Sequence, residues 1–193
     1  MLEKLLQYDT ELFLYLNKLG SPTWDRLWLI ITAEFTFVPL YLVLLYLIYK
    51  SYGFKPMLIF VLTIALMITF TDQITNLFKH TFQRPRPCRL DELVNEGMRY
   101  IAARCGRYGF FSGHASNSMA AAVFGGLVLR KHYKNLIFIL LFWSFFVAYS
   151  RIYVGVHYPI DLFCGMIFGA LAGFGFYKLG LYFLRRFEKH NVS

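Results

Sequence analysis

The segment Ser150–Asp161, with the sequence SRIYVGVHYPID, holds three side chains that together could act on a phosphate group. Arg151 carries a planar guanidinium that can hold two phosphate oxygens at once. His157 can serve as a nucleophile or a base near neutral pH. Asp161 follows four residues later, a helical spacing that can bring its carboxylate back to the imidazole and support positive charge there. The alternative is a histidine and an arginine paired at a helix end for solubility.

A second polar segment, Lys79–Pro87, has the sequence KHTFQRPRP. Its prolines stiffen the backbone into an extended form, which holds Arg84 and Arg86 forward. Lys79 also recurs with Asp72 at helical spacing, and ionisable residues inside a membrane are usually functional. A cluster of interfacial cations with their stems along the lipid would give the same composition.

The third segment, Ser112-Gly113-His114, would open another helix. A glycine beside a helix start leaves backbone N–H groups available to an anion, and the Ser112 hydroxyl is a further donor. His114 would then lie within reach of a leaving group. A serine N-cap followed by an interfacial histidine is the alternative interpretation.

The elements that must position these segments are membrane-spanning helices. The 193-residue chain is 58% hydrophobic and only 16% charged, whereas a soluble domain carries about 25% charge. A spanning helix needs about 20 mainly apolar residues, and the first of the segments that qualify is interrupted only by Glu34. The expected spans are roughly 27–49, 57–78, 112–129, 135–150 and 160–184. We therefore expect an all-α membrane protein, a single domain over residues 1–193 built as a bundle of about five transmembrane helices.

Residues 1–20 show a one-sided apolar pattern with helical spacing. This pattern predicts an amphipathic helix, which either lies at the membrane surface or packs on the bundle. The same residues lack a basic region followed by an apolar core and a small-residue cleavage site, so we expect no signal peptide.

The cations divide the predicted bundle into two ends. One end collects Lys50, Lys55, Arg130, Lys131, Lys134, Arg185, Arg186 and Lys189. The positive-inside rule makes that end cytoplasmic. Loop 80–111 at the opposite end carries six arginines against this rule, and a bound anion would explain them. The formal charge of +9 therefore indicates membrane orientation and an anionic ligand rather than nucleic acid.

The chain contains three cysteines. Cys164 lies within an apolar segment and is expected to be a packing residue. Cys88 and Cys105 flank the polar loop, where a disulfide would form in an oxidising compartment. Two unrelated free thiols are the alternative.

Taken together, the three polar segments resemble the signature of the type 2 phosphatidic acid phosphatases. That superfamily also contains bacterial acid phosphatases and vanadium haloperoxidases. The resemblance covers roughly residues 72–175, and Phe111 stands where the family often has a proline that shapes the turn. The matching motifs are Lys79-x6-Arg86-Pro87, Ser112-Gly113-His114 and Ser150-Arg151-x5-His157-x3-Asp161.

The resemblance implies a role for each signature residue. His157 would attack phosphorus and form a phosphohistidine, while Asp161 would orient His157 and stabilise its charged form. His114 would protonate the leaving oxygen and later activate water. The residues expected to bind the phosphate oxygens are Lys79, Arg86, Ser112, Gly113 and Arg151. Because these cations are side chains, the resemblance implies no metal and no other cofactor.

The expected protein is thus a lipid phosphatase of a bacterial inner membrane, with its site facing the periplasm or the outside. Undecaprenyl diphosphate is the first expectation for the substrate, on prior grounds, followed by phosphatidate, phosphatidylglycerophosphate and lipid A phosphate. A lipid phosphotransferase that uses the same phosphohistidine is one alternative. A non-catalytic protein that binds or scrambles lipid phosphates is another, although binding alone would need only the cations. The sequence does not indicate an oligomeric state.

Overall fold

Helices build the bundle, as the sequence predicts. The computed structural model describes residues 1–33 and 35–190, and within this range one isolated bridge, Pro85 with Tyr108, takes the place of any strand. The helices are α1 (Leu2–Lys18), α2 (Pro22–Thr32), α3 (Val38–Tyr52), α4 (Phe54–Phe82), the 3-10 helix η1 (Pro87–Arg89), α5 (Asp91–Asn95), α6 (Gly113–Leu129), α7 (Leu136–Tyr153) and α8 (Pro159–His190). Among the described residues, α4, α7 and α8 are long and apolar enough to cross a membrane, and α3 is a shorter apolar helix.

The predicted span 27–49 differs from the structure, which divides this stretch between α2 and α3. Pro39 lies in the first turn of α3. Its ring would collide with the carbonyl of Phe35 in a continuous helix, and it has no N–H to donate, so a helix begins there but does not pass through. Glu34, which the sequence places inside this span, lies outside the described residues.

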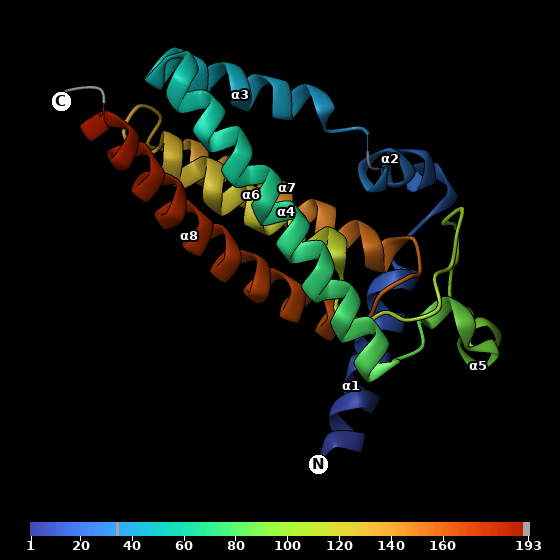
Figure 1. The fold of residues 1–193 in the computed structure, drawn as a ribbon. Helices are drawn as coiled ribbons and strands as arrows, with labels where there is room; N and C mark the ends of the chain where they lie inside the picture. The colour runs from blue at the N-terminus through green and yellow to red at the C-terminus, as the bar shows by residue number, and fades with distance from the viewer. Residues whose placement is uncertain (34, 191–193) are drawn as a thin grey trace.

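Helix α6 lies at the centre of the bundle, between α4, α7 and α8 (Figure 1). It approaches α8 closely because three glycines of α8 face its backbone. A Cβ at Gly165 would come within 2.7 Å of the Ser112 carbonyl oxygen, and one at Gly173 within 2.6 Å of that of Ala120. Gly169, between them, faces Ser116 in the same way. Such close backbone approach is how helices associate in lipid, and here it holds the start of α6 against the start of α8.

The close contact of α6 with Gly165, Gly169 and Gly173 of α8, called the α6–α8 seam below, gives a prediction about stability. Gly169→Ala is expected to lower the free energy of unfolding by about 1–3 kcal/mol, because the new Cβ would overlap the Ser116 backbone and push α6 from α8. Gly175→Ala is the matched control, since a Cβ there would meet no other atom of the described residues within 4 Å. Thermal unfolding in detergent micelles measures both, and an equal loss in the two variants would contradict the seam.

Helix α1 packs on the bundle, which decides between the two positions considered for the N-terminal residues. Its buried residues, among them Phe13 and Leu14, face α7 and α8. Its other face is exposed and apolar through Leu5, Leu12 and Tyr15. The predicted amphipathic helix is therefore present, with its inner face in the protein core and its outer face available to lipid.

The chain ends and connections divide between two ends of the bundle (Figure 1). The α3–α4 junction, the α6–α7 connection and the C-terminal part of α8 share one end. The end of α4, the start of α6 and the α7–α8 connection share the other, together with α1, α2 and α5. A disulfide between Cys88 and Cys105 closes the loop at this second end, and Cys164 is free and half-buried. The alternative of two unrelated thiols is therefore excluded.

Candidate active site

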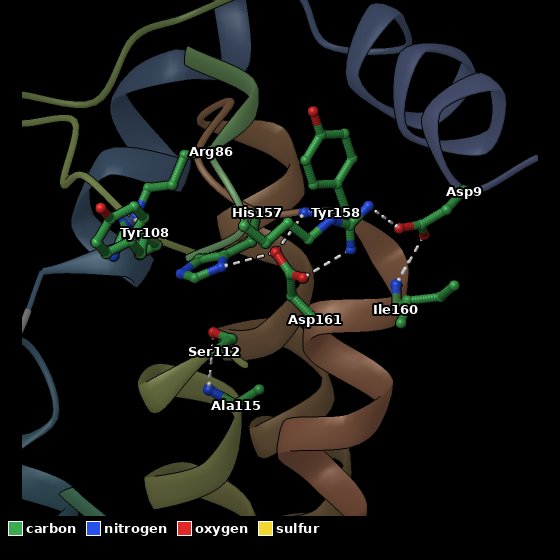
Figure 2. A network of polar contacts seen from close by, with 10 residues as sticks. Asp9, Arg86, Tyr108, Ser112, Ala115, His157, Tyr158, Ile160 and Asp161 are labelled. Atoms are coloured by element: carbon green, nitrogen blue, oxygen red, sulfur yellow. Dashed lines mark hydrogen bonds and ion pairs between the residues drawn. The ribbon is translucent and has the colours of Figure 1, made fainter. Parts of the chain in front are cut away.

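The three polar segments meet at one end of the bundle, where His157 lies at their centre. The residue follows α7 and precedes α8 in the short connection 154–158, and only 2% of its surface is exposed. Its Nδ1 lies 3.2 Å from Oδ2 of Asp161 in the first turn of α8 (Figure 2). Because this contact occupies Nδ1, the ring presents Nε2 as the nitrogen for chemistry.

Asp161 is held from several directions and is fully buried. Its Oδ2 also accepts from the backbone N–H of Tyr158 at 3.1 Å, while its Oδ1 accepts from Nη1 of Arg84 at 2.9 Å. The backbone N–H of Ser112 donates to the Asp161 carbonyl at 3.0 Å, which joins the start of α6 to the start of α8. The carboxylate is thus fixed beside the imidazole before any ligand binds.

Burial and surrounding cations together set the charge state of His157. Burial lowers the pKa of His157 well below its usual value, and the positive charges of Arg86, Arg151, Lys79 and Arg84 lower it further. The imidazole is therefore neutral at neutral pH, the form in which a ring nitrogen carries a lone pair for attack.

Three of the expected phosphate-binding residues, Lys79, Arg86 and Arg151, lie close enough to His157 for their charges to affect it. A Cβ at Gly113 would lie 3.7 Å from Nζ of Lys79, so the glycine leaves room beside this cation. Arg86 donates from Nε to the carbonyl of Tyr108 at 3.0 Å. Arg151 donates to the hydroxyl of Thr32 in α2.

Ser112 and His114 occupy the first turn of α6. The Ser112 hydroxyl accepts a hydrogen bond from the backbone N–H of Ala115 at 3.5 Å, so this side chain caps α6. A serine N-cap was the alternative interpretation of this segment. His114 lines a cavity next to the backbone of Thr32 and near the charges of Arg151 and Lys79.

That cavity has a volume of about 370 Å³. It reaches Lys79, Gly113 and His114, whereas His157 is packed next to these residues rather than on the cavity wall. A second cavity of about 410 Å³ continues between α3, α4 and α6, and Tyr41 and Asn117 line both. The other residues of the second cavity are apolar: Leu44, Leu45, Ile48, Val61, Ile64, Ile68, Ala121, Phe124 and Gly125. A cavity that holds the polar side chains of Lys79, His114 and Asn117 therefore lies next to an apolar cavity.

Sequence reasoning missed several neighbours of the site. Thr32, in α2, contacts Arg151 and lines the polar cavity. A Cβ at Gly109 would come within 3.0 Å of Oδ2 of Asp161 and 3.6 Å of Nδ1 of His157, so a larger residue would press on this pair. Arg84, which the prolines were expected to hold forward beside Arg86, contacts Asp9 and Asp161. No local pattern marks Thr32 or Gly109, because each contacts a distant part of the chain.

Comparison with known proteins identifies the family. The family model described as the PAP2 superfamily matches residues 55–185, more than half of the chain. The chain belongs to the PAP2 superfamily. This membership confirms the resemblance to the type 2 phosphatidic acid phosphatases that its three motifs indicate.

Two relatives of this chain carry the name lipid A 4′-phosphatase. The one from Bacteroides thetaiotaomicron is 39% identical over 180 residues, covering 92% of this chain and 79% of the relative. The one from Porphyromonas gingivalis is 32% identical over 184 residues, covering 94% of this chain and 76% of the relative.

Two solved structures share the fold of this chain. The transmembrane PAP2-type phosphatidylglycerolphosphate phosphatase of Bacillus subtilis superposes with a TM-score of 0.72 at 19% identity, covering 91% of this chain and 86% of that protein. The Aquifex aeolicus protein LpxE superposes with a TM-score of 0.67 at 27% identity, covering 87% of this chain and 93% of that one. Both likenesses support an all-α membrane fold for this chain.

Proposed function

We propose that this integral membrane lipid phosphatase removes a phosphate from lipid A through a phosphohistidine intermediate. The observation that carries the mechanism is the neutral, buried His157, fixed by Asp161 at 3.2 Å and surrounded by cations. A neutral imidazole can attack phosphorus, and the positive charge that develops on it is stabilised by the adjacent carboxylate.

In the first step Nε2 of His157 attacks phosphorus, a P–N bond forms, and the bond from phosphorus to the lipid oxygen breaks. His114, which takes up a proton as the phosphate anion binds beside it, gives that proton to the leaving oxygen. In the second step water attacks phosphorus, the P–N bond breaks and returns its electron pair to Nε2 of His157, His114 takes a proton from the water, and inorganic phosphate leaves. Charge on the phosphate oxygens is met by Lys79, Arg86, Arg151, Ser112 and the Gly113 N–H. These groups need no bound metal to bind the phosphate.

The shape of the cavities supports an amphiphilic substrate with a polar headgroup. Lys79 and His114 line the polar cavity together with Asp72 and Asn117, and Asn117 donates to Asp72 at 2.7 Å. The Asp72 carboxylate would repel a second phosphate, whereas this carboxylate and the Asn117 amide can both bind the hydroxyl and amide groups of a sugar. The adjoining apolar cavity is suited to an acyl chain.

The names of the two relatives also favour lipid A phosphate over undecaprenyl diphosphate, the first expectation from sequence. A prenyl diphosphate has no sugar to engage Asp72 and Asn117. The preference for lipid A therefore rests on two independent lines of support.

Two features support a site that faces the periplasm of a bacterial inner membrane. The disulfide between Cys88 and Cys105 lies at the site end of the bundle, and disulfides persist in oxidising compartments. Cations such as Lys55, Arg130 and Arg186 gather at the other end. The positive-inside rule predicts this excess of Lys and Arg for cytoplasmic loops.

The test is phosphate release in detergent micelles with EDTA present, using lipid A, phosphatidate, phosphatidylglycerophosphate and undecaprenyl diphosphate at equal concentrations. We expect lipid A to be hydrolysed fastest, with mass spectrometry showing the loss of one phosphate. Faster hydrolysis of undecaprenyl diphosphate would overturn the substrate assignment and leave the phosphatase mechanism intact. Phosphate that appears only on an added acceptor lipid would identify a phosphotransferase, and no turnover of any lipid would favour a binding protein.

A further inference from the structure

A carboxylate from the N-terminal helix lies buried beside the site. Asp9 of α1 is only 4% exposed. Its Oδ2 accepts from Nη2 of Arg84 at 2.6 Å, and its Oδ1 accepts from the backbone N–H of Ile160 at 2.8 Å (Figure 2). Ile160 lies in the first turn of α8, next to Asp161, so Asp9 contacts both the helix start and the arginine that serves this carboxylate.

Arg84 connects Asp9 to the histidine. The two terminal nitrogens of its guanidinium contact Asp9 and Asp161, at 2.6 and 2.9 Å. Its Cζ lies 4.0 Å above the ring of Tyr158, and Phe13 packs edge-on against the same ring. The guanidinium is thus fixed by two carboxylates and one aromatic face, and the contacts run from Asp9 through Arg84 and Asp161 to His157.

A second anchor ties α1 to the end of α7. Nδ2 of Asn17 donates to the carbonyls of Ile152 and Tyr153 at 2.9 and 3.1 Å, and Oδ1 of Asn17 accepts from the backbone N–H of Arg99 at 2.7 Å. Asn17 is fully buried. Helix α1 therefore holds the end of α7 through Asn17 and the start of α8 through Asp9, on either side of the connection that carries His157.

We infer that α1 belongs to the positioning apparatus of the active site, with Asp9 acting as a positioning residue for His157 through Arg84 and Asp161. The inference rests on the proposed function, because it assigns Asp9 a part in the attack by His157. Neither the histidine signature nor its spacing contains Asp9 or Arg84.

Charge balance gives the physical reason. The positive charge of Arg84 next to Asp161 would, by itself, offset much of the negative charge of this carboxylate. Asp161 would then stabilise the developing imidazolium of His157 less. Asp9 neutralises Arg84 from its other side, so the carboxylate of Asp161 keeps its attraction for the ring. Because all these groups are shielded from water, the effect of one missing charge is large.

The experiment compares Asp9→Asn with the wild type in the full-length protein in micelles, with lipid A as the substrate. We expect kcat to fall about tenfold, a size typical of charged residues in direct contact, with KM changed less than twofold. Asp9→Glu should recover part of kcat. Glu3→Gln is the matched control, because Glu3 is an exposed acid of the same helix and its loss should leave kcat unchanged.

The pH profile separates positioning from a general structural defect. Loss of the Asp9 charge makes protonation of His157 harder, so the acidic limb of kcat/KM should move to lower pH in Asp9→Asn. A merely loosened fold would lower the rates without moving the limb. The charged and titratable groups that face His157 are Asp161 of α8, Lys79 of α4, His114 of α6, Arg151 of α7, and Arg84 and Arg86 after α4.

A second variant keeps the test decisive if Asp9→Asn does not fold. Asp9→Leu with Arg84→Met removes both charges of the pair, and such apolar replacements are often neutral for stability. Because both charges of the pair are absent, the charge balance at Asp161 is kept, and kcat of the folded double variant should stay near the wild-type value. A tenfold loss of kcat in the double variant, wild-type kcat in folded Asp9→Asn, or a limb that stays in place in Asp9→Asn would overturn the inference. If the wild type hydrolyses none of the lipids, the proposed function fails instead. ¹⁵N NMR of the His157 ring then tests the contact chain alone, and identical ring signals in wild type and Asp9→Asn would overturn it.

Discussion

Replacing His157 with glutamine is expected to lower phosphate release from the lipid by about 10³-fold or more while the protein stays folded. Glutamine is polar and of similar size, so it can still contact Asp161, but its amide nitrogen has no lone pair for attack on phosphorus. The measurement is phosphate release in micelles, with thermal unfolding to show that the fold is kept.

The matched control is His80→Gln. His80 is an exposed histidine near the end of α4 whose ring lies 6.3 Å from that of Tyr108, and its loss should leave turnover near the wild-type rate. Wild-type enzyme quenched during turnover of a ³²P-labelled lipid should carry an acid-labile, base-stable phosphoryl group that His157→Gln lacks. Full activity in His157→Gln would refute the nucleophile assignment.

Arg151→Lys keeps the positive charge and is still expected to lower kcat/KM by about 10²-fold, the usual cost of one lost donor to developing charge. A lysine is a point charge on a flexible stem, and it cannot replace a planar fork that binds two phosphate oxygens. The shorter reach of its single ammonium would also lose the contact with Thr32 of α2. Steady-state kinetics with the preferred lipid measure the effect.

Arg104→Lys serves as the control for this exchange, because Arg104 is exposed in the loop at the same end of the bundle. Its kinetics should match the wild type. If Arg151→Lys also shows wild-type kinetics, Arg151 lies outside the phosphate site and its contact with Thr32 serves only to join α7 to α2.

In the proposed mechanism, the packing of the helices brings three polar chain segments together at the active site. Helix α6 carries His114 and α8 carries Asp161, and the glycines of α8 set the distance between these helices. Gly109 leaves space against the Asp161 carboxylate, which a larger residue would displace. Packing and chemistry are therefore coupled, so variants far from the cations can still change the rate.

Several features of this protein could be predicted from sequence because they depend on local patterns. Long apolar runs require spanning helices in lipid, since every backbone polar group must be satisfied within its own segment. Alternation of these spans places residues 79–87, 112–114 and 150–161 at the same end. The four-residue spacing of His157 and Asp161 predicts a contact within one helical turn, and the structure has it at 3.2 Å. Membership in the PAP2 superfamily follows from the same three motifs.

Other features depend on contacts between residues far apart in the chain, and only the tertiary structure decided them. Pairing of Cys88 with Cys105 needed the loop conformation, and the packing of α1 needed the surface of α7 and α8. Asp9 meets Arg84 across 75 positions and Ile160 across 151, so no periodicity in the sequence marks Asp9 as part of the site. Periodicity determines which face of a helix is apolar, whereas the partner of a buried charge is set by how the helices pack.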